Sequence, residues 1–127
     1  MLVDTDVLIW HLRGYRQAAQ RLDRLPELTL SVISYLELIQ GMRNKAELAA
    51  VQKMLALRKA DVLPLTGAIT QRAVRLMETL TLSHGLQLAD ALIAATAIEH
   101  SLTLLSGNIK HFNSVEGLQI EHFKLAR

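Results

Sequence analysis

The run LVDTDVLIW at residues 2–10 is apolar except for Asp4, Thr5 and Asp6, and it constrains the fold more than any other segment. Such a run belongs in the interior, as a buried strand or the start of a buried helix. Two ionised carboxylates inside it cost several kcal/mol unless each is paired or bound to a metal. We therefore expect the rest of the chain to supply compensation at this point.

Strand-like and helix-like segments alternate along the chain. The strand-like segments are short and apolar, and they cover residues 1–6, 28–32, 61–65, 102–106 and 118–123. The helix-like segments have apolar residues at helical spacing, and they cover residues 7–12, 17–25, 34–41, 45–59, 66–82 and 86–100. This order predicts an α/β fold with a mainly parallel central sheet.

The helix expected over residues 45–59 separates core positions from surface positions. Basic residues interrupt its apolar residues at helical spacing, which is typical of a helix with one buried face. We expect the buried set to be Leu48, Val51, Leu55 and Leu57.

Length and composition indicate one globular domain over residues 1–127, with half of the residues hydrophobic and a fifth charged. The chain has no cysteine, which excludes disulfides and thiolate chemistry. No apolar run approaches the roughly 20 residues of a membrane span, and the N-terminus lacks the basic region of a signal peptide. We expect a protein without a membrane segment, located in the cytoplasm. The net charge of +2 favours no class of partner.

Three acidic residues lie at junctions between expected strands and helices. Asp4 follows the first strand, Glu37 lies near the start of the helix after the second strand, and Asp90 lies near the start of the helix LQLADALIAA. Taken alone, each can serve a helix dipole. In open α/β sheets, however, ligands bind outside the carboxyl ends of the strands, so we expect the three side chains to converge there.

Converging carboxylates repel one another, and each raises the pKa of its neighbours. A divalent cation would remove this conflict and keep all of them ionised. Oxygen ligands without cysteine or a paired histidine motif favour Mg²⁺ or Mn²⁺ over Zn²⁺. The expected chemistry is phosphoryl transfer at a metal held by these carboxylates.

Three segments resemble the PIN-domain ribonucleases of the VapC toxin type: LVDTDVLI, SVISYLELIQGMR and LADALIAATAIEHSLTLLSGNIKHF. The resemblance runs nearly end to end. It implies a PIN-like three-layer α/β/α sandwich in which Asp4, Glu37 and Asp90 are catalytic residues and metal ligands.

The resemblance also marks four further positions. Asn108 stands where the family has a fourth acidic catalytic residue, and because an amide adds no charge we expect one firmly bound metal rather than two. Ser106 stands where the family often has threonine. Together with Thr5 and Asp6 it is expected to support the site, and Asp6 is expected to cap the helix from Val7 in preference to contacting the metal.

By the same resemblance, the chain would be a metal-dependent endoribonuclease that cuts RNA. It would be the toxin of a toxin–antitoxin pair, a homodimer silenced by a cognate antitoxin protein that enters the acidic cleft.

Two alternatives remain open from the sequence. The DTD motif resembles the start of haloacid-dehalogenase-type phosphatases, with Asp4 as nucleophile and Asp6 as acid, but no adjacent acidic pair follows residue 90. Asn108 favours a second alternative, a catalytically silent PIN-fold module that binds a partner.

His111 is close to the expected site in sequence. We expect it to pack with Phe112 in preference to contacting a phosphate.

Overall fold

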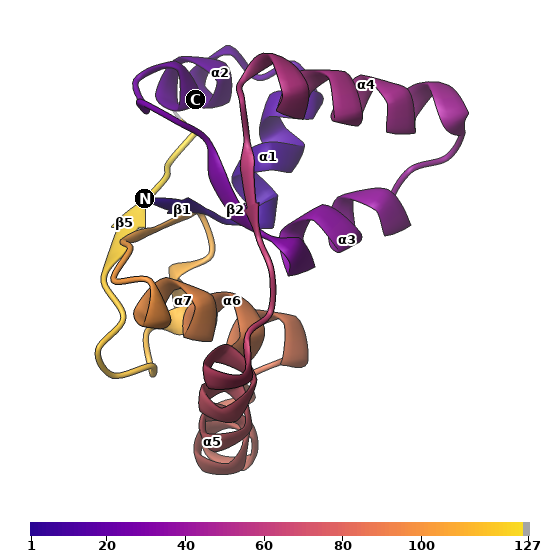
Figure 1. Ribbon diagram of the computed structural model, residues 1–127. Helices are drawn as coiled ribbons and strands as arrows, with labels where there is room; N and C mark the ends of the chain where they lie inside the picture. The colour runs from indigo at the N-terminus through magenta and orange to yellow at the C-terminus, as the bar shows by residue number, and fades with distance from the viewer. Residues whose placement is uncertain (126–127) are drawn as a thin grey trace.

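Five parallel strands form the central sheet (Figure 1). The computed structural model describes residues 1–125, and within them the strand order is β3-β2-β1-β4-β5. Every neighbouring pair is parallel, so the predicted α/β fold with a parallel sheet is confirmed. The strands are β1 (Leu2–Val3), β2 (Thr29–Ser31), β3 (Asp61–Leu63), β4 (Leu104–Ser106) and β5 (Ile120–His122).

Seven helices connect these strands within residues 1–125. They are α1 (Thr5–Leu12), α2 (Arg16–Asp23), α3 (Val32–Gln40), α4 (Lys45–Leu57), α5 (Gly67–His84), α6 (Leu88–Glu99) and α7 (Ile109–Phe112). The first six match the predicted helices, with their ends shifted by a few residues. The short α7 lies in a stretch that the sequence pattern predicts as a turn.

Alternate residues of the two central strands face opposite layers of helices. Leu2 and Leu104 pack in one apolar cluster with residues of α5 and α6. Val3 and Leu105 pack in a second cluster with residues of α1, α2, α3 and α4. Figure 1 shows the two groups of helices on opposite sides of the sheet. The structure therefore has the predicted three-layer α/β/α arrangement.

The chain changes direction across the sheet beside β1. It runs outward from β1 through β2 to β3, and then returns to place β4 and β5 on the other side of β1. In parallel sheets this switch point opens a crevice outside the carboxyl ends of the two central strands. Asp4 follows β1 and Ser106 ends β4, so both lie at that crevice.

Helix α1 begins earlier than the sequence pattern predicts. β1 is only two residues long, and Asp4 is the N-cap of α1, where its carboxylate accepts a hydrogen bond from the backbone N–H of Thr5 at 2.8 Å. Asp6 therefore lies in the first turn of the helix, and the prediction that it caps a helix starting at Val7 is wrong. The reason is that a carboxylate directly after a strand can accept a hydrogen bond from the first free N–H of a helix.

Leu57 is the second departure from the sequence pattern. Val51 and Leu55 are buried on the inner face of α4 as predicted, but Leu48 is only half-buried and Leu57 is 73% exposed. Leu57 is the last residue of α4. At the end of a helix, helical spacing alone no longer predicts which side chains are buried in the core.

Helices α5 and α6 pack against each other below the sheet in Figure 1. Small residues let them approach closely, and Ala91, Ala94, Ala95 and Ala97 of α6 are fully buried. Gly85 ends α5 in the left-handed backbone conformation, with φ of 71°. Over residues 1–125, no helix combines the length and the apolar character needed to cross a membrane.

The buried ring of Phe112 is predicted to anchor α7 to the core. Phe112 is fully buried, so Phe112→Ala should lower the free energy of unfolding by about 3–5 kcal/mol, as measured by urea denaturation. Leu57→Ala, which truncates an exposed side chain, is the matched control and should change it by less than about 0.5 kcal/mol. A loss below about 1 kcal/mol in Phe112→Ala would contradict this account of α7.

Candidate active site

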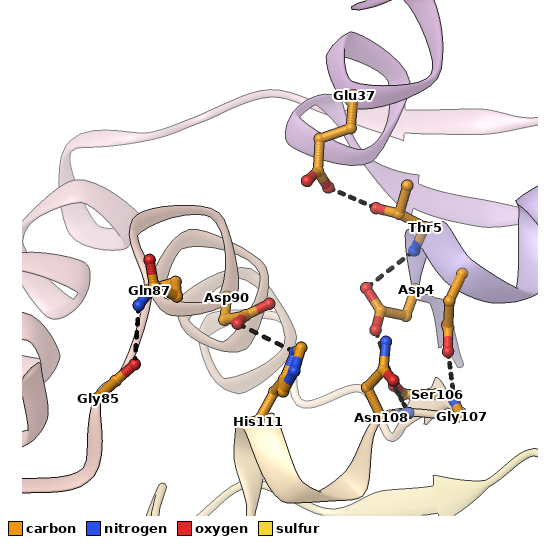
Figure 2. A network of polar contacts seen from close by, with 11 residues as sticks. Asp4, Thr5, Glu37, Gly85, Gln87, Asp90, Ser106, Gly107, Asn108 and His111 are labelled. Carbon is orange, nitrogen blue, oxygen red and sulfur yellow. Dashed lines mark hydrogen bonds and ion pairs between the residues drawn. The ribbon is translucent and has the colours of Figure 1, made fainter. Parts of the chain in front are cut away.

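Asp4 lies at the centre of a polar cluster at the carboxyl edge of the sheet (Figure 2). Its side chain is 5% exposed, and each of its oxygens has a hydrogen-bond donor. Oδ1 accepts the N–H of Thr5 at 2.8 Å, and Oδ2 accepts the hydroxyl of Ser106 at 2.7 Å. Ser106 is fully buried at the end of β4, so the two central strands are joined through Asp4 at the switch point.

Glu37 reaches the cluster from α3. The hydroxyl of Thr5 donates to Oε1 of Glu37 at 2.6 Å and lies 2.9 Å from the hydroxyl oxygen of Ser34. Ser34 is fully buried and precedes Glu37 by three residues, so both face α1 from one side of α3. Thr5 thereby orients the Glu37 carboxylate toward the end of β1.

Asp90 reaches the cluster from the first turn of α6. Its Oδ2 lies 3.4 Å from Nδ1 of His111 in α7. The ring of His111 also lies 6.4 Å from the ring of Phe112, so the predicted packing and a contact with the site occur together. A protonated His111 would form an ion pair with Asp90.

The turn between β4 and α7 closes the cluster. The N–H of Gly107 donates to Oδ2 of Asp6 at 2.9 Å, and the N–H of Asn108 donates to the hydroxyl oxygen of Ser106 at 2.9 Å. Asn108 is exposed and is the N-cap residue of α7. Asn108 therefore lies on a turn that is hydrogen-bonded to both Asp4 and Asp6.

Burial and neighbouring negative charges raise the pKa of carboxyl groups in the cluster. Burial raises the pKa of Asp4 from 3.8 to about 7, and the negative charges of Asp6 and Asp90 act in the same direction. Burial also raises the pKa of Asp90; the charges of Glu37 and Asp6 add to this effect, whereas His111 opposes it. Burial raises the pKa of Asp6 against the opposing hydrogen bonds from backbone N–H groups. The site therefore favours a cation or protons.

Figure 2 shows the carboxylates of Asp4, Glu37 and Asp90 directed from three sides toward one space. Within residues 1–125, no three acidic or histidine side chains form a ready coordination cluster, since Glu37 is turned toward Thr5 and Asp90 faces His111. The atoms available to bind a metal are nevertheless all carboxylate oxygens. A divalent cation relieves the repulsion between carboxylates. The chemistry of these oxygen ligands therefore fits Mg²⁺ or Mn²⁺.

Sequence reasoning missed three contributors to the cluster. Ser34 could have been found, because it precedes Glu37 by three residues on one helix and therefore lies on the same helix face. No sequence pattern indicates Gly107, because its role depends on the approach of Asp6 from a distant segment. The contact between His111 and Asp90 depends on α7, which the sequence pattern did not predict.

Comparisons with known proteins agree on one family. The family model described as the PIN domain matches residues 1–118. Ribonuclease VapC10 of Mycobacterium tuberculosis is 42% identical over 123 residues, which cover 94% of this chain and 90% of that protein.

Solved structures match the fold over almost the whole chain. A toxin–antitoxin complex from Klebsiella pneumoniae contains a chain with a TM-score of 0.74 and 31% identity, covering 92% of this chain and 93% of that one. The VapBC2 structure from Rickettsia felis, bound to a DNA fragment from its promoter, has a TM-score of 0.83 at 20% identity, covering 97% and 98%. The second likeness concerns the fold alone.

The raised pKa of Asp4 predicts that the metal-free protein loses stability as the pH rises. Between about pH 4 and about pH 7 the folded protein keeps a proton on Asp4 that the unfolded chain releases. In EDTA, the free energy of unfolding should therefore fall across this window, by up to about 4 kcal/mol, and stay low above it. Urea denaturation at a series of pH values measures this dependence.

Asp4→Asn should flatten most of that pH dependence, because the amide does not titrate. Glu116→Gln, which replaces an exposed carboxylate, is the matched control and should leave the dependence unchanged. A wild-type protein whose stability rises between about pH 5 and about pH 7 would show that Asp4 is not destabilised by ionisation.

Proposed function

Because this chain belongs to the PIN-domain family and, within it, to the VapC-type ribonucleases, we propose that it is a metal-dependent endoribonuclease that hydrolyses RNA phosphodiester bonds. The observation that carries the proposal is the set of three carboxylates, from the end of β1, from α3 and from α6, directed at one space beside the switch point of the sheet. Clustered carboxylates of this kind favour a divalent cation.

The proposed roles follow from the contacts of each side chain. Asp4, Glu37 and Asp90 would hold Mg²⁺ or Mn²⁺, which when bound supplies Lewis-acid polarisation of a phosphodiester and activation of water. The hydroxyl of Ser106 fixes one oxygen of Asp4, and the hydroxyl of Thr5 fixes one oxygen of Glu37. These hydroxyls hold the carboxylates in place before the substrate binds.

Asn108 is proposed as the fourth catalytic position. It lies on the exposed turn after β4, where its side chain can contact a phosphate or a water without adding negative charge. Three carboxylates and one amide hold one divalent cation more readily than two, because each additional ion needs further anionic ligands. We therefore propose one firmly held ion.

An antitoxin protein is the proposed partner, and the chain has a groove that suits it. The groove has a volume of about 630 Å³ and lies between α1, α3 and α4. Its lining includes the apolar side chains of Ile9, Leu12 and Leu38 together with the charged side chains of Arg13 and Glu37. An amphipathic segment lying in this groove would reach the acidic site through Glu37 and block it.

A homodimer is the proposed assembly. Leu82 and Leu88 lie on either side of the turn between α5 and α6 and are 100% and 65% exposed, and Leu36 of α3 is 53% exposed. In the proposed dimer these exposed apolar side chains are buried against the surface of the second copy. The proposed location is the cytoplasm, where an RNA substrate would be available.

The alternative function is a silent module that binds a partner without cleaving RNA. The amide at Asn108 is the observation that favours it, because position 108 contributes no negative charge to the site. The dehalogenase-type phosphatase is disfavoured by membership of the PIN-domain family.

Cleavage of a fluorescent RNA oligonucleotide library tests the ribonuclease. The wild-type protein should cut RNA with Mg²⁺ or Mn²⁺ and lose this activity in EDTA. Asp4→Asn and Asp90→Asn should each lower kcat by about 100-fold or more, while Glu116→Gln keeps full activity. Cleavage that survives both EDTA and Asp4→Asn would exclude the proposed site. Partner binding without any turnover would favour the silent module.

Light scattering coupled to size-exclusion chromatography tests the assembly. The wild-type protein should have the mass of a dimer, and Leu82→Asp combined with Leu88→Asp should give a monomer because two charges would be buried in the interface. Leu57→Asp places a charge at an equally exposed leucine on α4 and should leave the dimer intact. A dimer that survives the double substitution would rule out this surface.

A further inference from the structure

The carboxylate of Asp6 joins two segments that are far apart in the chain. Its Oδ1 accepts the N–H of Val7 at 2.8 Å within α1, and its Oδ2 accepts the N–H of Gly107 at 2.9 Å after β4. Both oxygens are therefore engaged by backbone donors. A local contact within the first turn of α1 would use only the bond to Val7, so the bond to Gly107 needs a separate explanation.

The position requires a carboxylate. An asparagine side chain has one acceptor oxygen and an amide nitrogen that would face one of the two N–H groups. Serine can accept a hydrogen bond near the start of α1, but its side chain is one atom too short to span to Gly107. Asp6 is thus the residue type that can serve both segments at once.

Gly107 matches Asp6 from the other side of the contact. A Cβ atom at Gly107 would lie 2.7 Å from Oδ2 of Asp6 and 3.3 Å from the carbonyl oxygen of Phe123. Gly107 does not have a positive φ, so it is the space taken by the Asp6 carboxylate that requires glycine here. The two residues therefore form one contact, and a side chain at Gly107 would break it.

The tethered turn carries parts of the candidate active site. Asn108 follows Gly107 directly, and its N–H is bonded to the same Ser106 hydroxyl that donates to Asp4. The turn leads into α7, where His111 faces Asp90. A shift of Gly107 would move Asn108 and His111 relative to the buried carboxylate of Asp4.

We propose that Asp6 is a positioning residue, whose carboxylate ties the Gly107–Asn108 turn to the start of α1 and so fixes Asn108 and α7 against Asp4. This inference rests on the proposed ribonuclease function for its catalytic consequence. The tether itself is a property of the fold and can be measured without substrate or metal.

Hydrogen exchange of the residue 107 amide, measured by NMR in EDTA, tests the tether independently of any activity. Asp6→Ser keeps a polar side chain at the start of α1 but releases the turn, so exchange of the Gly107 N–H should become at least about tenfold faster. Thr66→Ala removes the N-cap contact of α5, at 3.2 Å from the N–H of Ile69, and is the control for loss of a helix cap. It should leave Gly107 exchange unchanged. Equal exchange rates in wild type and Asp6→Ser would overturn the tether.

The kinetic test uses Asp6→Ser, Asp6→Ala, Gly107→Ala and the combination of the last two. Asp6→Ser should lower kcat for RNA cleavage by about 10- to 100-fold with KM changed less than about threefold, because the misplaced turn affects the reacting geometry. Gly107→Ala should give a similar loss in the wild-type background. In the Asp6→Ala background, Gly107→Ala should lower kcat by less than about threefold, because the carboxylate that would clash with the alanine side chain is gone.

The outcomes separate the tether from the function. Faster Gly107 exchange in Asp6→Ser, in a wild-type protein that cleaves no RNA, would support the tether and reject the ribonuclease. Losses in kcat that multiply in the double variant would show that Asp6 and Gly107 act separately, and this would overturn the proposal. Circular dichroism of each variant checks that it folds, and if Asp6→Ala does not fold, the comparison of Asp6→Ser with Thr66→Ala decides.

Discussion

The burial of Asp4 beside other carboxylates at one edge of the sheet is the constraint on which the site depends. Asp4 is almost fully buried, and the charges of Asp6 and Asp90 raise its pKa together with burial. Such a cluster destabilises the fold when it is ionised and unpaired. The hydrogen bonds around it offset part of this cost, and a divalent cation would offset far more. Binding of a cation and stability of the fold therefore depend on the same few carboxylate oxygens.

The topology explains why these residues meet. Residues that follow parallel strands gather at the carboxyl edge, a helix that leads back into a strand, as α6 leads into β4, begins at this edge, and the switch beside β1 leaves a crevice there. Asp4 arrives from the strand end, Glu37 from α3 and Asp90 from α6. Hydroxyl groups of Thr5 and Ser106 then set the direction of two carboxylates, and Asp6 holds the turn that carries Asn108.

Much of this arrangement could be predicted from the sequence, because the order of strands and helices determines which residues reach the edge of a parallel sheet. Asp4, Glu37 and Asp90 were predictable on that basis. The cap of α1 was not, since the choice between Asp4 and Asp6 depends on where a two-residue strand ends. Contacts such as Asp6 with Gly107 join segments about a hundred residues apart, and no local pattern encodes them.

The central claim is that Asp4 is held in a site that favours a divalent cation. The most direct measurement is a ¹³C NMR titration of the Asp4 carboxyl group, with and without Mg²⁺. The account predicts a pKa of about 7 in EDTA and a pKa well below that value with Mg²⁺. A pKa near the ordinary 3.8 in EDTA, or one that Mg²⁺ does not change, would contradict it.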